Sequence, residues 1–445
     1  MHLIQTFKWI HPLDIASTIL GQYQQSAFFY SGQQRSYSGS MSIIAIDKKQ
    51  SITGNDIALL SEHLTDNQHV FSNAWFGYFA YNFRHSLEHY PKAKEIPKTK
   101  GSSFSFPPIH FTQYRTLIIF DHIQQSVTLW SENEDNIVLC RLLDGTISPE
   151  DNSNIATPHI ASLSSNMTKS EYLDKVSFIK GEIARGTLSQ ANLTRKFYGT
   201  FSDRPDIHQI IRLFVSLCRI SPSPYSSLIC DEGRYILSSS PEQFIRIQNN
   251  TACTRPIKGT APRCNNPQQD ISSYNNLLYS TKDRAENLMI VDLMRNDFSR
   301  SCEVGSVRVE NLFKVSSHAS VHHMSSTILG KKRSDISTLS FITHCFPPGS
   351  MTGTPKIKAI ELSTQLEEDE RGVYSGIIGW FGGDGGFDSS VVIRTLLIEE
   401  SQSEFQVGGA IVDDSTPEAE WQETIMKARD ICMLLNIPLQ QLETL

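Results

Sequence analysis

The chain has 445 residues, of which 39% are hydrophobic and 20% are charged, and its formal net charge is -7. This composition is typical of a soluble globular protein, and the length accommodates one large domain or two ordinary ones. Because acidic and basic residues are mixed, nothing makes a basic footprint for nucleic acid, and no run of Lys/Arg suggests a membrane surface. A small anionic substrate would then need local positive charge or a metal ion.

The eight cysteines form no C-x-x-C pair and have no regular spacing. This pattern indicates buried or incidental thiols in a reducing compartment, and neither a disulfide framework nor a zinc site. Charged residues interrupt the only apolar stretch near the N-terminus, and no segment reaches the length of a membrane span. We therefore expect a cytoplasmic protein.

The character of the chain changes near residue 166. Short strand-like runs and polar turns come first, and residues 146–166 have the Ser, Asn, Thr and Pro composition of a linker. A helix is then predicted over Ser170–Arg185 and a strand over Gln190–Phe197, after which strands and helices alternate. The pattern predicts an α+β protein in three parts: an N-terminal region (1–165) that ends in the linker, a motif-dense region (166–437) and a tail (438–445).

Lys258 lies between a proline and a glycine in the segment Arg255–Thr260. Proline fixes φ and glycine permits close backbone approach, so we predict a tight loop that presents the amine to a pocket. A desolvated lysine can act as a nucleophile or a base, whereas a solvated loop lysine is inert. The segment alone favours the solvated lysine, and only the downstream motifs reverse that preference.

Ser415 and Thr416 provide a predicted helix start, with Pro417 and Glu418 in the first turn. One face carries an apolar stripe, and a different face carries Glu420, Glu423 and Lys427 at spacings i, i+3 and i+7. Two carboxylates beside an amine can hold a divalent cation next to an anionic group. The alternative is a solvated face with an ion pair between Glu423 and Lys427.

A second acidic pair, Asp283 and Glu286, lies on a predicted helix over Lys282–Asp297 that is apolar nearly all round. Such a helix is buried, and buried carboxylates need a metal, a cation or several donors. An ion pair with Lys282 or Arg284 is the competing explanation. Because neither His nor Cys clusters with these acids, two acidic pairs favour a bridged Mg²⁺ site.

Two further features point to an anion. Gly408 and Ala410 flank a glycine step at the end of a strand-like run, where backbone N–H groups can cradle a carboxylate, although a β-bulge is the plain alternative. Arg394 falls inside the predicted strand Val391–Thr395. It either pairs with an internal acid or points into a site, where its planar fork suits a carboxylate.

Seven segments together resemble the chorismate-binding enzymes, and they occur in the order seen in that family. They are Ser240–Glu242, Arg255–Thr260, Lys282–Asp297, Val321–Met324, Phe346–Lys356, Ile393–Thr395 and Gly408–Lys427. The family includes component I of anthranilate synthase and of aminodeoxychorismate synthase, the isochorismate synthases and the salicylate synthases. The resemblance makes 166–437 the chorismate-binding catalytic region and implies an α+β fold with a large β-sandwich core flanked by helices, like anthranilate synthase component I.

The resemblance also implies roles for individual residues around an Mg²⁺ ion that grips the ring carboxylate of chorismate. Glu286 and Glu423 would bind the metal directly, and Asp283 and Glu420 would support it through water. Glu242 resembles the general acid that protonates the departing C4 hydroxyl.

The remaining implied contacts lie around the enolpyruvyl side of chorismate. His323 resembles the family histidine near that group and the C4 hydroxyl. Substrate contacts would come from Arg394, Tyr374, Lys427, Ser350, Thr260, Gln190 and the backbone of Gly408 and Ala410.

Two positions favour one branch of the family. Gln190 stands where isochorismate and salicylate synthases carry a water-activating lysine, so the pocket is set for ammonia. Anthranilate synthases read P-I-A-G-T where this chain reads P-I-K-G-T, and the amine of Lys258 resembles the aminodeoxychorismate synthases. Lys258 would attack C2 with allylic loss of the C4 hydroxyl, and ammonia would then attack C4 and release the lysine.

The partners follow from the same resemblance. The chain carries no glutaminase and no lyase module, so we expect ammonia from a separate glutaminase subunit and a downstream aminodeoxychorismate lyase. Tryptophan in a structural or regulatory pocket remains open. The leading hypothesis is component I of aminodeoxychorismate synthase, on the path to 4-aminobenzoate and folate. The alternatives are component I of anthranilate synthase and a catalytically silent scaffold for a glutaminase.

Overall fold

Antiparallel strand pairing dominates the computed structural model, which describes residues 1–445 except 33–39, 65–68, 88–103, 134–135, 150–154 and 319–320. Every strand pairing between described residues is antiparallel. The pairings form two sheets that share the long strands β3 (Met41–Gly54) and β5 (Ile109–Asp121), so the two sheets are continuous at one side.

The first sheet contains strands from both ends of the chain. Its other members are β1 (His2–Lys8), β2 (Gln25–Tyr30), β6 (Ser126–Ser131), β7 (Ile160–Ser165), β8 (Gln190–Phe201), β9 (Tyr225–Asp231), β10 (Arg234–Ser240), β16 (Gly353–Thr354), β19 (Thr395–Glu399) and β20 (Gln402–Ile411). Neighbours follow the order β7–β8–β20–β19–β10–β9–β2–β3–β5–β6–β1, with β16 also paired to β8.

The second sheet starts from the first residues of β5. Its strands are β4 (Trp75–Phe79), β11 (Gln243–Gln248), β12 (Thr251–Arg255), β13 (Ile257–Pro262), β14 (Arg308–Ser317), β15 (Val321–Lys331), β17 (Ile377–Phe381) and β18 (Phe387–Val391). Neighbours follow the order β5–β4–β17–β18–β11–β12–β15, and β15 also pairs with β13 and β14.

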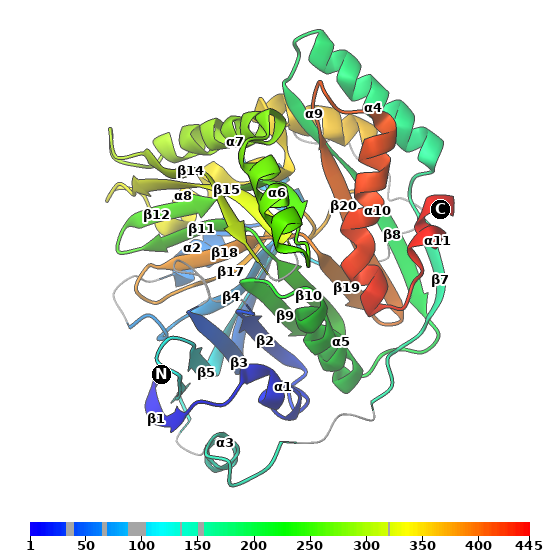
Figure 1. The fold of residues 1–445 in the computed structure, drawn as a ribbon. Coiled ribbons are helices and arrows are strands. Elements are labelled where there is room, and N and C mark those ends of the chain that lie inside the picture. Colours follow the sequence, from blue (N-terminus) through cyan, green and yellow to red (C-terminus); the bar gives the residue numbers. More distant parts are fainter. Residues whose placement is uncertain (33–39, 65–68, 88–103, 134–135, 150–154, 319–320) are drawn as a thin grey trace.

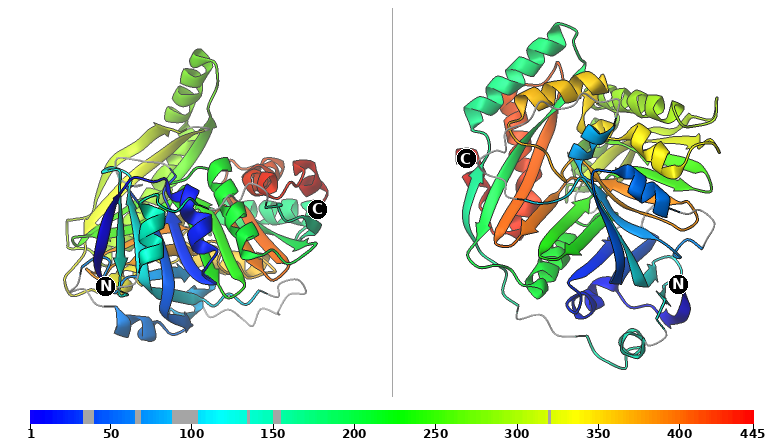
Figure 2. Two further views of the ribbon diagram at one scale, coloured as in Figure 1. Left: turned by 90° about the horizontal axis from the view of Figure 1, so that it is seen from below. Right: turned by 180° about the vertical axis from the view of Figure 1, so that it is seen from behind.

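Helices lie on the outer faces of both sheets (Figures 1 and 2). They are α1 (Pro12–Leu20), α2 (Ile57–His63), α3 (Ile137–Leu143), α4 (Lys169–Ala184), α5 (Ile207–Ile220), α6 (Pro267–Leu278), α7 (Thr281–Ser299), α8 (Thr338–Cys345), α9 (Lys356–Leu366), α10 (Pro417–Leu434) and α11 (Leu439–Thr444), with 3₁₀ turns at Tyr81–Ser86 and Gly349–Met351. Among the described residues, none of these helices is long and apolar enough to cross a membrane.

The core has three layers of apolar contact. Ile229 and Leu397 of the first sheet pack against Tyr78 and Ile378 of the second, which fills the space between the sheets. Helices α1, α4, α5 and α10 cover the outer face of the first sheet, and α7 and α8 cover that of the second. This arrangement confirms the predicted α+β fold with a β-sandwich core flanked by helices. All eight cysteines are free, as their spacing predicted.

The predicted helices are confirmed with their starts. The helix expected over 170–185 is α4, which begins with a capping box in which the Thr168 side chain accepts a hydrogen bond from the backbone N–H of Glu171. The helix start expected at Ser415 and Thr416 is that of α10, where the Thr416 side chain accepts from the backbone N–H of Ala419 and Pro417 lies in the first turn. The apolar stripe of α10 is buried against the first sheet, and Trp421, its first residue, is fully buried.

The predicted linker is partly structured. Residues 160–165 form β7, which pairs with β8, and residues 150–154 of the predicted linker lie outside the described part of the chain. Strands from before residue 165 also enter both sheets, because β2 pairs with β9 and β4 pairs with β17. The division into regions at residues 165 and 437 stays a prediction.

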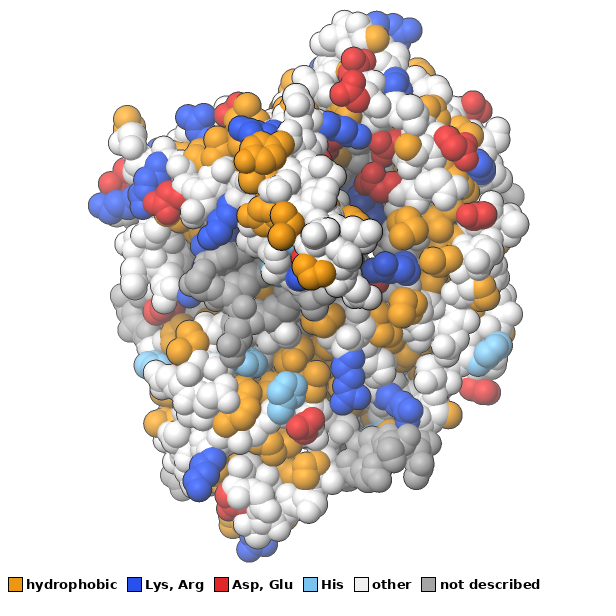
Figure 3. Space-filling view, in the orientation of Figure 1, with side chains coloured by type: hydrophobic (Ala, Val, Ile, Leu, Met, Phe, Trp, Pro, Cys, Tyr) orange, Lys and Arg blue, Asp and Glu red, His pale blue; other side chains and the backbone are white. Residues whose placement is uncertain are grey.

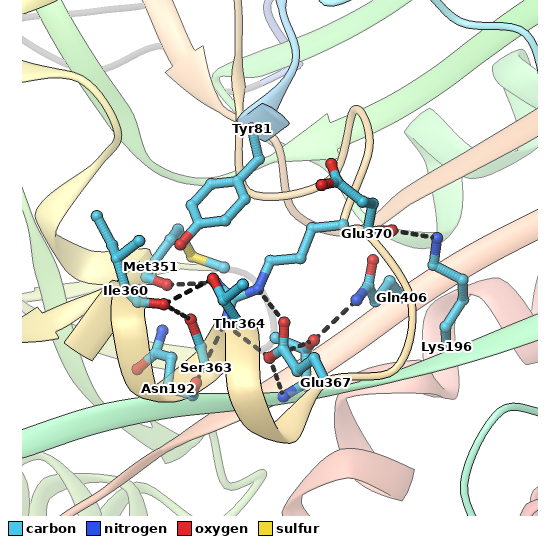
Figure 4. A network of polar contacts seen from close by, with 12 residues as sticks. Tyr81, Asn192, Lys196, Met351, Ile360, Ser363, Thr364, Glu367, Glu370 and Gln406 are labelled. Atoms are coloured by element: carbon cyan, nitrogen blue, oxygen red, sulfur yellow. Dashed lines mark hydrogen bonds and ion pairs between the residues drawn. The ribbon is translucent and has the colours of Figure 1, made fainter. Parts of the chain in front are cut away.

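A buried ion pair connects the first sheet to the segment around residue 350 (Figure 4). Arg371 is 1% exposed and Glu367 is 8% exposed, and two N–H···O bonds of 2.7 Å join them. Arg371 also donates to the backbone oxygens of Met351 (2.6 Å) and Asn192 (3.1 Å), and its guanidinium lies 4.7 Å from the centre of the Tyr81 ring. The pair therefore holds together β8, the 3₁₀ turn Gly349–Met351 and the 3₁₀ turn Tyr81–Ser86.

Candidate functional site

A cavity of about 710 Å³ lies where the two sheets meet helices α7 and α10. Figure 3 shows acidic and basic side chains close together in a hollow on this face of the molecule. Nearly every residue singled out from the sequence lines it: Glu242, Lys258, Thr260, Asp283, Glu286, His323, Ser350, Tyr374, Arg394, Gly408, Ala410, Glu420, Glu423 and Lys427. The exception is Gln190, which is fully buried at the start of β8 outside the cavity lining.

Lys258 presents a partly buried amine to this cavity. The predicted tight loop is wrong: residues 257–262 form β13, because pairing with β15 fixes the segment, although the register shifts between Ile257 and Thr260. Gly259 in this irregular stretch has φ +88°, and an added Cβ would lie 2.9 Å from the Asp283 carboxylate. Glycine therefore lets β13 approach α7 closely.

The electrostatics of Lys258 favour a neutral amine. Burial lowers its pKa, and the charge of Lys427 lowers it further, while the carboxylates of Glu286, Glu242 and Glu423 oppose this change. Among the described residues, the amine makes no hydrogen bond or ion pair that would hold its charge. An amine in this setting can act as a nucleophile or a base.

Glu242 follows β10 and is 6% exposed. Burial raises the pKa of this carboxyl to about 7, although a hydrogen bond from the Ser350 hydroxyl and the charge of Lys258 both act to lower it. A carboxyl with a pKa near neutrality is partly protonated under ordinary conditions and can donate a proton. The geometry therefore suits the general-acid role that the resemblance implies for Glu242.

His323 lies on β15 at the side of the cavity formed by the second sheet. It is 5% exposed, and its Nδ1 lies 2.9 Å from the hydroxyl oxygen of Thr260, which is directly opposite it across the β13–β15 pair. This hydrogen bond orients the imidazole, so that His323 and Thr260 present one polar surface to the cavity.

Two pairs of carboxylates face the cavity from different helices. Asp283 and Glu286 come from α7, and Glu420 and Glu423 come from α10. The prediction of a helix buried nearly all round is wrong for α7, because Leu288 is 43% exposed and only one side of the helix packs on the sheet. The ion pairs weighed from the sequence are present, with Lys282 at 3.9 Å from Glu286 and Lys427 at 2.6 Å from Glu423.

These pairs leave part of the negative charge unbalanced. Burial raises the pKa of Glu286, and the nearby Asp283 and Glu423 add to that rise against Lys258 and Lys282. Burial also raises the pKa of Glu420, whose Oε1 accepts from Ser415 at 2.6 Å while its Oε2 is buried without a partner. For Glu423, the effect of burial is outweighed by Lys427, and the pKa is lowered.

The donor set fits a hard divalent cation. Within the described residues, no three His, Cys, Asp or Glu side chains already form a metal-binding group. The carboxylates nevertheless offer only oxygen ligands, and one of their buried oxygens, Glu420 Oε2, has no hydrogen-bond partner among the described residues. Neighbouring carboxylates also raise the pKa of Glu286 and Glu420, and a cation between them would relieve this repulsion.

Arg394 and Tyr374 also line the cavity. Arg394 is not inside a strand: it lies in the turn between β18 and β19 with φ 51°, because the chain must leave one sheet and enter the other at this point. Burial lowers the pKa of Arg394, and Asp430 at 3.9 Å opposes that change. Burial also raises the pKa of the Tyr374 hydroxyl, so that it remains a hydrogen-bond donor.

The glycine step of β20 pairs with β8 in unbroken register, so the β-bulge considered from the sequence is absent from these residues. Beyond Phe405, β20 has no strand partner on its β19 side within the described residues, and Lys427 instead bonds the backbone oxygen of Gly408 at 2.8 Å. An added Cβ on Gly409 would lie 2.7 Å from the Glu420 carboxylate. The glycines therefore let α10 approach the strand closely.

Sequence reasoning missed several residues that line the cavity, among them two buried amides. They are Asn192 of β8 and Gln406 of β20, two strands whose paired surface forms the floor of the cavity. A signal was present, because Gln190, Asn192 and Thr194 place polar side chains at alternate positions of a buried strand, which faces them to one side.

Comparison with known proteins gives a consistent family. A family model of chorismate binding enzymes matches residues 23–433. Aminodeoxychorismate synthase component 1 of Escherichia coli (strain K12) is 34% identical over 407 residues, covering 89% of this chain and 86% of that protein. Anthranilate synthase component 1 of Aquifex aeolicus (strain VF5) is 35% identical over 281 residues, covering 63% and 56%.

A solved structure gives the same fold. Anthranilate synthase component I from Streptococcus pneumoniae TIGR4 has a TM-score of 0.75 at 23% identity, covering 89% of this chain and 93% of that one. The fold, the ordered motifs and the extent of the family match agree, and the chain belongs to the chorismate-binding enzyme family.

Proposed function

We propose that the chain is component I of an aminodeoxychorismate synthase and aminates chorismate at C4, with ammonia from a separate glutaminase subunit. The observation that carries this proposal is the Lys258 amine, which has a lowered pKa and faces the same cavity as Glu242. The E. coli relative with that name is similar over most of both chains, while relatives named anthranilate synthase keep the second assignment open.

The residues supply the steps in order. The neutral Lys258 amine attacks C2 of chorismate, both conjugated double bonds of the ring shift, and the C4–O bond breaks. Glu242 protonates the departing hydroxyl, which leaves as water. Ammonia then forms a bond to C4, both double bonds shift back, and the C2–N bond breaks, so that Lys258 leaves as the neutral amine and the new C4 nitrogen carries the positive charge. The product keeps its enolpyruvyl group, so a separate lyase would be needed to form 4-aminobenzoate for folate synthesis.

Charged groups around the cavity would hold the two carboxylates of chorismate. We infer that Glu286 and Glu423 bind Mg²⁺, with Asp283 and Glu420 supporting it through water, because these four carboxylates come together at the cavity from α7 and α10. When bound, Mg²⁺ would supply positive charge for the ring carboxylate. Arg394, Tyr374 and Lys427, which line the same cavity, would bind the enolpyruvyl carboxylate.

The product of the reaction tests the proposal. The purified chain is incubated with chorismate, Mg²⁺ and excess ammonium, and aminodeoxychorismate lyase is added to half of the sample. We expect 4-aminobenzoate only in the half with lyase. Anthranilate without lyase would assign the chain to the other synthase, and no turnover with an intact glutaminase complex would indicate a silent scaffold.

Replacing Lys258 tests its role as the nucleophile. Lys258→Ala should lower the rate of 4-amino-4-deoxychorismate formation by about 10²-fold or more, or redirect amination to C2, because ammonia alone would then attack. Binding of chorismate with Mg²⁺ should stay near the wild-type value. Lys358→Ala, which removes an exposed amine on α9, serves as the control. An unchanged product and rate in Lys258→Ala would remove Lys258 from the mechanism.

The pKa of Glu242 predicts the pH profile. Because the acid must be protonated, kcat/KM should fall as pH rises through about 7, whereas the need for a neutral Lys258 amine lowers the rate at acidic pH. Glu242→Gln should lower kcat by roughly 10²-fold and remove the fall near pH 7.

Thermal stability separates this effect from misfolding. A buried carboxyl with a raised pKa costs no stability below about pH 4, and the cost grows as pH rises and is complete above about 7. Glutamine carries no such cost, so Glu242→Gln should melt at pH 8 no lower than the wild type. A lower melting temperature would trace the lost activity to structure.

If Glu423 binds the metal ion, replacing it should weaken Mg²⁺ binding and chorismate binding together. Glu423→Gln should weaken both Mg²⁺ and chorismate binding by about tenfold or more, since the metal would join the protein to the substrate. Titration of activity with Mg²⁺ at several chorismate concentrations measures both effects. Glu418→Gln, on an exposed position of the same helix, is the matched control. Full activity of Glu423→Gln at limiting Mg²⁺ would contradict the assignment.

We also infer that tryptophan occupies a second cavity of about 660 Å³ between the sheets. Phe71, Trp130 and Trp380 form an aromatic wall, and Arg246 and Asp388 offer opposite charges for an amino acid. Calorimetric titration should show tryptophan binding, and the absence of heat would reject it. Strong inhibition of turnover by tryptophan at low concentration would favour the anthranilate synthase assignment.

A further inference from the structure

Ser415 lies in the turn that joins β20 to α10 and is 1% exposed. Its backbone N–H donates to the backbone oxygen of Val412 at 3.0 Å, and its hydroxyl oxygen accepts from the Val412 N–H at 3.1 Å. From the other side, the Lys180 ammonium group of α4 donates to the backbone oxygen of Ser415. These bonds fix both the backbone and the hydroxyl oxygen of this residue.

The hydroxyl proton of Ser415 is directed to the side chain of Glu420. The distance from Ser415 Oγ to Glu420 Oε1 is 2.6 Å. An ionised carboxylate can only accept, and the Val412 N–H already occupies a lone pair of the hydroxyl oxygen, so Ser415 is the donor. A hydroxyl bonded to a carboxylate at this length makes a stronger bond than two neutral groups would. Ser415 therefore ties one of the two carboxylate oxygens to the turn.

Helix α10 does not need this bond in order to begin. Its N-cap is Thr416, whose hydroxyl accepts from the Ala419 N–H, and Pro417 in the first turn has no N–H to satisfy. Ser415 instead bonds a side chain one turn further along the helix. The bond thus serves the Glu420 carboxylate and not the start of the helix.

The other oxygen of Glu420, Oε2, is left beside Glu423. A Cβ added to Gly409 would lie 2.7 Å from Glu420 Oε2 and 3.6 Å from Glu423 Oε1, so the two carboxylates are close neighbours above one point of β20. Oε2 is buried and has no hydrogen-bond partner among the described residues. Like charges this close repel, and an untethered glutamate would turn its carboxylate away. The bond from Ser415 opposes that rotation.

We propose that Ser415 is a positioning residue for the metal site, because it holds Glu420 with Oε2 beside Glu423, where Oε2 can accept from a water bound to the cation. This inference rests on the assignment of Mg²⁺ to Glu286 and Glu423 in the proposed function. It adds a residue outside the cavity lining that touches neither the metal nor the substrate. A side chain held in place before the cation arrives loses less freedom on binding, so the tether raises the affinity.

Binding of Mn²⁺ to the full chain without chorismate tests this role. Mn²⁺ takes the same oxygen ligands as Mg²⁺, and electron paramagnetic resonance measures the free ion directly. Ser415→Ala should raise the Kd for Mn²⁺ about tenfold, the size of one lost hydrogen bond to a charged group. Ser415→Cys, which fills the site with a weaker donor, should change the Kd in the same direction if Ser415→Ala does not fold.

Turnover gives a second measurement of the same effect. The Mg²⁺ concentration for half-maximal rate should rise about tenfold in Ser415→Ala, while kcat at saturating Mg²⁺ stays within about twofold of the wild-type value. A large loss of kcat at saturating Mg²⁺ would contradict a role that acts only through the position of a carboxylate.

A double-mutant cycle separates positioning from a purely structural role. In a chain that already carries Glu420→Gln, Ser415→Ala should have little further effect on the Mn²⁺ Kd, because an amide NH₂ in place of Oε2 cannot accept. An equal rise of the Kd in both backgrounds would assign Ser415 to structure and overturn the proposal. An unchanged Kd in Ser415→Ala with Glu420 intact would also overturn it.

Thr416→Ala is the matched control, since it removes the N-cap bond of the same helix start but no contact with Glu420. It should lower the melting temperature and leave the Mn²⁺ Kd within about twofold of the wild-type value. An equal loss of affinity in Thr416→Ala would trace the effect to the helix start and overturn the proposal. If the wild-type chain binds no Mn²⁺, the metal assignment fails and this inference with it, whereas the product assay with lyase decides the amination separately.

Discussion

The buried ion pair between Arg371 and Glu367 is the interaction on which the arrangement of the cavity depends. Two charges removed from water are tolerable only when their hydrogen-bonding groups are used, and Arg371 donates to Glu367 and to two backbone oxygens from different segments. Removing one partner of such a pair costs about 3–5 kcal/mol, because the other charge stays buried. The pair thus fixes the relative position of these segments. Because Glu367 can only accept and Arg371 can only donate, it also fixes which groups around the pair donate and which accept.

The charges around the cavity divide its acids into two kinds. Burial outweighs the charge of Lys258 at Glu242 and raises its pKa to about 7, whereas Lys427 beside Glu423 holds the pKa of that carboxylate low. One acid is thereby suited to carry a proton and the other to carry a charge. The charges of both carboxylates also act on the Lys258 amine, but burial outweighs them and lowers its pKa.

Local features and ordered motifs could be predicted from the sequence, because they depend on neighbouring residues. The cap at Thr416, the stripe that contains Trp421 and the collection of acids and amines around one cavity are examples. Features that depend on residues far away in the sequence could not be predicted in this way. Residues 257–262 form a strand only because β15 lies beside them, and the turn at Arg394 exists because the chain changes sheets.

The amide of Gln406 shows the same limit more sharply. Gln406 bonds the side chain of Thr194, which is 212 residues away in the sequence. Thr194 in turn bonds Glu367, which is 173 residues away from it. No local sequence pattern indicates a hydrogen bond between residues so far apart. The alternation of polar residues on β8 could still have marked Asn192, since a buried strand directs several polar side chains to one face only where they find partners or a ligand.

The pairing of β8 with β20 has a consequence for synthesis of the chain. These strands are adjacent in the sheet, but β20 and the helix α10 after it lie close to the C-terminus, so the ribosome makes β8 long before its partner. Until then, one edge of β8 is unpaired, and unpaired edges invite association with other chains. The floor of the cavity is therefore completed late, and a prematurely terminated chain would be both inactive and prone to aggregate.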